Sequence, residues 1–114
     1  MKDFTQIRKV GGEYYQSFLD AGYKEYTSDA NHLADSLLSK RIYKGDKHLY
    51  SIMIYCYDWS RHHQRGGNPF SIQSEVQFNQ STSGTFDVIY HNSEARVSEI
   101  EEFFNRVYVA MECQ

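Results

Sequence analysis

Residues 59–68 are the segment of this chain that most suggests binding or catalytic chemistry. They include Trp59, Arg61, His62, His63 and Arg65, in a connection longer than the usual loop of about 2–5 residues between neighbouring strands. Arg offers paired donors to a phosphate or carboxylate, and the two glycines of the segment let a ligand approach the backbone closely. The segment therefore predicts a loop that binds a partner or an anion, with a solvated surface loop as the alternative.

Recognisable metal-binding and catalytic motifs are absent from the sequence. His62 and His63 are adjacent, and neighbouring side chains of an extended chain point in opposite directions, so they rarely bind one metal ion together. Cys56 and Cys113 are isolated and are expected to be free thiols. No nucleophile elbow, zinc-protease motif or phosphate-binding loop occurs. We therefore expect no metal, no cofactor and no catalytic residues, and a protein that is not an enzyme.

The charge is divided unevenly along the chain. Residues 37–67 hold six Lys or Arg against two acids, a net +4, whereas residues 68–114 hold two against seven, a net −5. Such a division favours docking onto a charged partner, although ordinary solvated faces would also produce it. The predicted second group of contact residues lies in the basic segment and consists of Lys40, Arg41, Lys44 and Lys47. Basic residues near Tyr43, Tyr50 and Trp59 also allow stacking on single-stranded nucleic acid.

The 114 residues are the size of one domain, which we take to be residues 1–114, and 16% of them are aromatic, including ten Tyr. Tyrosine is enriched at protein interfaces, so the surplus favours a binding surface. The net charge of −3 does not favour strong general affinity for nucleic acid. No apolar run approaches the about 20 residues that span a bilayer, and the N-terminus has no apolar signal core. We therefore expect a cytoplasmic protein without a membrane partner.

The elements that must position these residues follow from periodicity and turn signals. Helical spacing predicts a helix over about 12–21, and whether residues 3–11 join it stays open. The capping pair Ser98 and Glu101 precedes an apolar stripe that predicts a C-terminal helix. Residues 29–38 are ambiguous, although Leu33, Ala34 and Leu37 fit a short helical turn. Alternation predicts four strands, at 39–43 on an edge, at 48–58 as a central strand covered on both faces, at 70–78, and at 85–91 with Phe86, Val88 and Tyr90 inward.

Short turns separate the predicted strands, so a mainly antiparallel meander is the simplest topology. A helix at each end of the chain would pack against this sheet. The expected fold is α+β, a two-layer sandwich in which a four-stranded sheet is flanked by an N-terminal and a C-terminal helix.

Several segments together resemble small uncharacterised proteins of phages and prophages. They are Asp35–Tyr43, Tyr50–Ile52, Tyr57–Asp58, Glu75–Phe78 and Glu99–Phe104. The resemblance implies a non-enzymatic inhibitor or modulator of a larger protein or nucleoprotein complex, including anti-CRISPR-like inhibitors of bacterial defences. Toxin-immunity proteins are a similar class. The sequence leaves open which partner is bound and whether the protein is a monomer or a homodimer.

Overall fold

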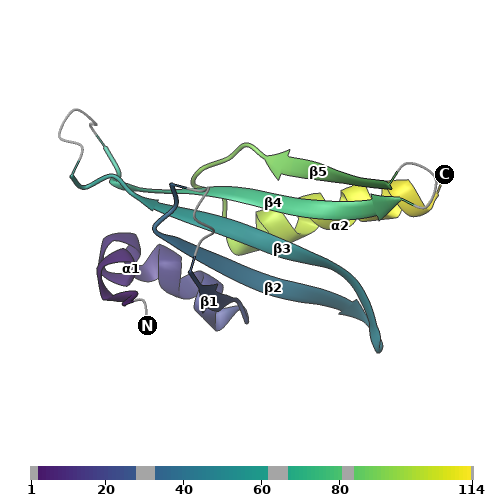
Figure 1. The fold of residues 1–114 in the computed structure, drawn as a ribbon, viewed down its shortest axis with the longest axis horizontal. Coiled ribbons are helices and arrows are strands. Elements are labelled where there is room, and N and C mark those ends of the chain that lie inside the picture. The colour runs from purple at the N-terminus through teal and green to yellow at the C-terminus, as the bar shows by residue number, and fades with distance from the viewer. Residues whose placement is uncertain (1–2, 28–32, 62–66, 81–83, 114) are drawn as a thin grey trace.

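The computed structural model describes residues 3–27, 33–61, 67–80 and 84–113. Within these residues it contains two helices and five strands, arranged along a molecule with a long axis of 47 Å (Figure 1). In chain order these are α1 (Thr5–Asp20), β1 (Lys24–Tyr26), β2 (Ser36–Lys44), β3 (Lys47–Asp58), β4 (Phe70–Gln80), β5 (Gly84–Tyr90) and α2 (Val97–Glu112).

The five strands form one antiparallel meander in the order β1-β2-β3-β4-β5. The predicted α+β fold with a helix at each end is confirmed. The prediction of four strands misses β1, which is only three residues long and too short to show alternation. The predicted edge strand at 39–43 is wrong in extent: the strand begins at Ser36, and residues 37–39 pair with β1. Residues 36–38 are therefore strand, with no helical turn.

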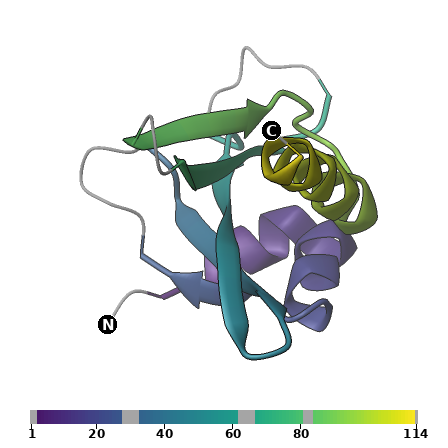
Figure 2. The same cartoon turned by 90° about the vertical axis from the view of Figure 1, so that its right-hand side faces the viewer.

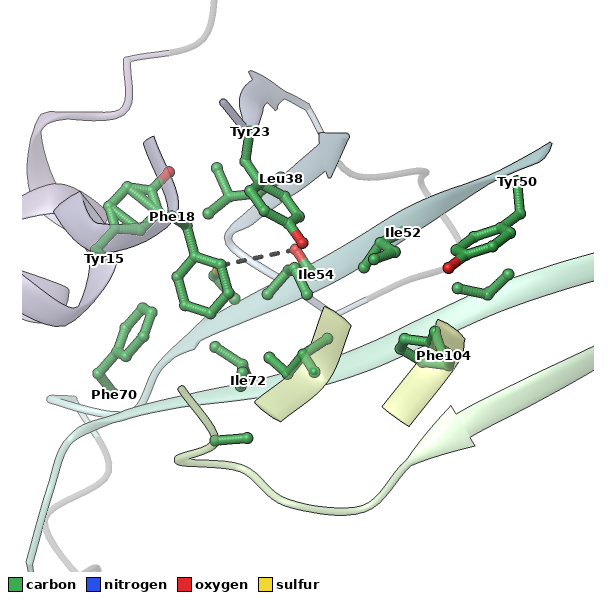
Figure 3. Packing of buried hydrophobic residues seen from close by; sticks show 14 of the residues in the cluster. Tyr15, Phe18, Tyr23, Leu38, Tyr50, Ile52, Ile54, Phe70, Ile72 and Phe104 are labelled. Atoms are coloured by element: carbon green, nitrogen blue, oxygen red, sulfur yellow. Dashed lines mark hydrogen bonds between the residues drawn. The ribbon is translucent and has the colours of Figure 1, made fainter. Parts of the chain in front are cut away.

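One face of the sheet carries the core. Cross-strand pairing aligns Ser36 with Cys56 and Cys56 with Ile72, so that even-numbered residues of β2, β3 and β4 share this face. Both helices lie against it (Figure 2), and their apolar side chains meet those of the strands (Figure 3). The largest fully buried side chains of the core include Tyr15, Phe18, Leu38, Ile52, Ile54, Phe70, Val76, Ile100 and Phe104.

The opposite face of β3 has no helix over it within the described residues, whereas the prediction was a central strand covered on both faces. Tyr55 is nevertheless buried on that face, and Met53 and Tyr57 are half-buried. Phe86 lies on the core face as predicted, since it pairs with the buried Phe78, but 36% of this residue remains exposed at the last strand of the sheet.

The paired glycines near the N-terminus explain the shape of α1. The helix begins at Thr5, so residues 3–11 do belong largely to it, but Gly12 has φ 57° and ψ −138° and breaks the regular helix. At Gly11 a Cβ would lie 2.5 Å from Cβ of Tyr15 and 3.1 Å from Cε1 of Phe70. The first glycine therefore permits close packing and the second permits the break. Gly22, with φ 99°, follows the end of the helix as predicted.

A polar network fastens α1 to the sheet. The Tyr15 hydroxyl donates to Oε2 of Glu25 at 2.9 Å and lies 3.2 Å from Oγ of Ser36. Arg8 forms an ion pair with the same Glu25 carboxylate. The network joins both halves of α1 to β1 and β2.

The N-terminus of α2 differs from the prediction. Arg96 is the N-cap residue, in extended backbone, and its amide donates to Glu99 at 3.4 Å. The helix thus begins two residues earlier than a Ser98 cap requires, and Ser98 lies within its first turn. Neither helix, as far as the chain is described, is long and apolar enough to cross a membrane.

Candidate functional site

A cleft of about 520 Å³ lies where the start of α1, the segment before β2 and the end of β3 meet. Trp59 and Arg61, two of the predicted contact residues, line it. Leu33, which is 92% exposed, contributes to the same cleft. The cleft therefore gathers residues from three segments that are far apart in the sequence.

The aromatic wall of the cleft is a stacked pair. The rings of Tyr57 and Trp59 have centroids 5.6 Å apart and planes inclined by 15°. Trp59 is fixed by two hydrogen bonds, from its Nε1 to Oγ of Ser71 at 2.7 Å and from its backbone amide to the carbonyl of Pro69, also at 2.7 Å. A half-buried aromatic surface that is already fixed loses little conformational entropy when a ligand binds to it.

Three carboxylates lie in the same cleft, those of Asp3, Asp35 and Asp58. Oδ2 of Asp35 accepts a hydrogen bond from the backbone amide of Asp58 at 2.7 Å, which connects the segment before β2 to the end of β3. Oδ1 of Asp58 accepts the amide of Ser60 at 2.9 Å. These bonds hold the acidic groups in place beside the stacked rings.

Two of the carboxylates are held in the charged form. Hydrogen bonds from Thr5 lower the pKa of Asp3. Burial by itself would raise the pKa of Asp58, but hydrogen bonds from Ser60 and Gln6 and the charge of Arg61 lower it overall. Both carboxylates are therefore anionic at neutral pH.

Arg61 is exposed and lies in this acidic surrounding. Among the described lining residues, three carboxylates face one guanidinium, so the cleft suits a cationic group better than the anion expected from the sequence. His62, His63 and Arg65 lie outside the described residues.

The second predicted group does not join the cleft. The ammonium of Lys40 lies on the helix-covered face, 3.1 Å from a Glu101 oxygen and 5.6 Å from the Tyr23 ring centroid. Lys40 thus acts within the fold. Arg41, which is exposed, points to the opposite face of β2.

Lys44 and Lys47 pair directly with each other across the turn between β2 and β3, at the far end of the molecule from the cleft (Figure 1). Tyr43 beside them is 52% exposed, and its ring lies 5.5 Å from that of His48. The described basic residues of this segment therefore do not form the single surface that its sequence suggests: Arg61 lies at the cleft, and Lys44 and Lys47 lie at the β2–β3 turn.

Metal-binding clusters of three or more His, Cys, Asp or Glu do not occur in the part of the chain that is described. Cys56 is buried and Cys113 is exposed, and both are free thiols as predicted. Sequence reasoning missed Asp3 and Asp35 as neighbours of Trp59, because only the folded chain brings their segments together. The alternation of the predicted strand at 48–58 does place Tyr57 and Trp59 on one side of it, as the stacked rings confirm.

Comparison of the chain with models of protein families, with curated proteins and with solved structures gave no match in any of the three. The arguments for function therefore come from the site itself.

Proposed function

We propose that this protein acts by binding a larger protein, without catalysis, and that the cleft beside Trp59 receives a basic side chain of that partner. The observation that carries the proposal is the pairing of the Tyr57–Trp59 stack with the carboxylates of Asp3, Asp35 and Asp58 in one cleft. A guanidinium or ammonium group gains from an aromatic face and from nearby anions at the same time.

The resemblance to phage accessory proteins favours a partner from a bacterial host. The size of the protein is consistent with an inhibitor of a host defence complex, anti-CRISPR-like in its action. An immunity protein could use the same cleft to bind and block a toxin. Either kind of inhibitor would act on its partner without a cofactor.

Selection from a library of displayed random peptides tests the proposal even though the partner is unidentified. We expect the selected peptides to be rich in Arg and Lys. Trp59 is the one tryptophan of the chain, so its fluorescence reports directly on binding in the cleft. Trp59→Ala should lower the affinity for the selected peptides by about 30-fold or more, corresponding to about 2 kcal/mol of binding free energy.

Matched variants show whether the peptides bind in the cleft or elsewhere on the molecule. Tyr43→Ala, next to the β2–β3 turn and not among the cleft residues, should leave peptide affinity unchanged. Arg61→Ala should strengthen binding of basic peptides, because it removes the cation that competes for the carboxylates. Weaker binding in Arg61→Ala, or selection of acidic peptides, would instead support the anion-binding hypothesis and contradict the proposal.

A second candidate function is binding of single-stranded nucleic acid by the tip of the β2–β3 hairpin. The observation in its favour is the exposed Tyr43 beside Arg41, Lys44 and Lys47. It predicts retention of an oligonucleotide in a gel assay that decreases steeply with salt and is lost in a Lys44→Ala, Lys47→Ala double variant. No retention at low salt would remove this candidate.

A further inference from the structure

The outer edge of β5 pairs with no other strand of the described part of the chain. β5 pairs with β4 on one side, and no described residue continues the sheet on the other side. Figure 1 shows this strand at the upper border of the sheet. In an antiparallel strand the N–H and C=O groups point alternately to the two sides, so half of those in β5 point away from the sheet.

This edge lacks the features that normally prevent pairing with another chain. Edges are commonly protected by short strands, bulges, Pro and charged residues, above all Lys. β1 is three residues long, and the part of β2 beyond it carries charges and a register shift between Ile42 and Tyr43. β5 has seven residues, and Asp87 is the one charged residue among them.

Some apolar side chains of β5 pack against the core, and others are partly exposed at this edge. Val88 and Tyr90 pack against the core, and the Tyr90 ring stacks on Phe103 of α2 at 4.5 Å. Phe86 and Ile89 lie on opposite faces of the strand, and each is 36% exposed. Another strand placed alongside β5 would cover apolar surface on both faces as well as the backbone groups.

We propose that a second copy of this chain pairs with this edge, β5 against β5 in antiparallel orientation, with Val88 of each copy on the two-fold axis. The two sheets then form one continuous sheet. A two-fold axis perpendicular to the sheet places the helices of both copies on the same side.

The sequence of β5 is self-complementary in this register. Phe86 lies opposite Tyr90 of the second copy, Val88 lies opposite Val88, and Asp87 lies opposite Ile89. Moving the axis to Asp87 would place two like charges directly opposite each other, which is unfavourable. Moving it to Ile89 would leave only residues 88–90 paired within β5, compared with residues 86–90 in the Val88 register. The Val88 register therefore fits the strand best.

Helix α2 offers matching charges beside the edge. Tyr90, Glu99, Glu102, Phe103 and Arg106 line a hollow of about 200 Å³ next to β5. Glu102 and Arg106 form an ion pair one helical turn apart. The two-fold axis makes the α2 helices of the two copies antiparallel, so charges of both signs from each copy lie near the shared edge.

Cysteine cross-linking tests both the dimer and its register. In a Cys113→Ser background, Val88→Cys should form a disulfide-linked dimer under mild oxidation, because directly opposite residues have Cα atoms about 4.5–5.5 Å apart. Thr85→Cys is the matched control on the same strand, since its two copies would be about 20 Å apart. Cys56 does not interfere, because it is buried and burial raises its pKa to about 12.

A charge exchange gives an independent result. Val88→Lys and Val88→Glu should each be monomeric in analytical ultracentrifugation, and an equal mixture should restore a dimer, which a merely misfolded variant cannot do. A wild-type protein that stays monomeric up to about 1 mM overturns the proposal. Pairing of β5 with a different protein, in place of a second copy, overturns it as well. Equal cross-linking at positions 85 and 88 overturns the register.

Discussion

Single hydroxyl and carboxylate groups determine how α1 is held on the sheet. Tyr15 is almost completely buried, yet its hydroxyl reaches both Glu25 and Ser36. A tyrosine in a core requires such partners, because an unpaired buried hydroxyl is costly. The tyrosine surplus of the sequence is thus divided: some tyrosines serve buried networks and others, such as Tyr43, lie at the surface.

Tyr15→Phe should lower the free energy of unfolding by about 1–3 kcal/mol, because it leaves Ser36 and Glu25 without the hydroxyl. Urea denaturation followed by circular dichroism measures the change. Tyr26→Phe is the matched control, since Tyr26 is 48% exposed in the neighbouring strand. Equal stability of the two variants would show that the network contributes nothing.

Glu25 should make stability depend on acid pH. The hydrogen bond from Arg8 is the largest cause that lowers the pKa of Glu25 in the folded state below its ordinary value of 4.5. A group whose pKa is lowered by folding stabilises the protein above its unfolded pKa, and this contribution is lost as the pH falls through the folded pKa. Glu25→Gln should therefore flatten the decrease in stability below pH 4.5.

Denaturation midpoints measured at a series of acid pH values give this dependence. Glu13→Gln, which changes an exposed carboxylate of α1, is the control. A Glu25→Gln variant with the wild-type slope would contradict the assignment.

At the scale of elements, periodic patterns were predictable and contacts between distant segments were not. Clean alternation gave β4 and its buried residues Phe70, Ile72, Val76 and Phe78, which the structure confirms. β1 lacked the length for such a pattern. The start of α2 was misplaced because Ser98 is a stronger cap by propensity than Arg96, whereas the extended backbone at Arg96 decides where the helix begins.

The candidate site was likewise predictable from sequence only where its residues lie close together along the chain. Sequence reasoning predicted Trp59 and Arg61 as contact residues, because an unusually long connection rich in functional side chains can be recognised from the sequence alone. It could not find the acidic surrounding, since Asp3 and Asp35 arrive from the start of α1 and from the segment before β2. The expected sign of the ligand charge changed for that reason.

Gly11→Ala should destabilise the protein although alanine favours helix formation by about 1 kcal/mol. A Cβ at this position would overlap Cβ of Tyr15 and crowd the Phe70 ring, so α1 would have to move away from β4. Thermal denaturation should show a lower midpoint than for the wild type. Lys9→Ala, at an exposed position of the same helix, is the control, and a rise in midpoint for Gly11→Ala would contradict the close contact.

On the scale of the whole molecule, protection by the helices is concentrated toward the middle of β3. Ile52 and Ile54 are fully buried beneath them, whereas Lys44, Asp46 and Lys47 at the hairpin tip are exposed. Exposed hydrogen bonds far from a packed core open at a lower free energy than central ones.

Hydrogen exchange followed by NMR should therefore show a gradient along β3. We expect the slowest amide exchange around Ile52 and Ile54 and the fastest near Lys47, although all three belong to one strand. Uniform protection along the strand would show that the hairpin unfolds only together with the whole domain.

The difference between the two borders of the sheet limits how many molecules can assemble. At one border, β1 is three residues long and the part of β2 beyond it carries charges and a register shift, so that border is poorly suited to pairing with another strand. The proposed pairing uses the other border, and each molecule has one such border. In the dimer, both β5 borders are used for pairing. The continuous sheet of the dimer then ends on each side at the β1 border. The stoichiometry would therefore stop at two, and growth into filaments, the usual hazard of an open sheet, would have no site at which to continue.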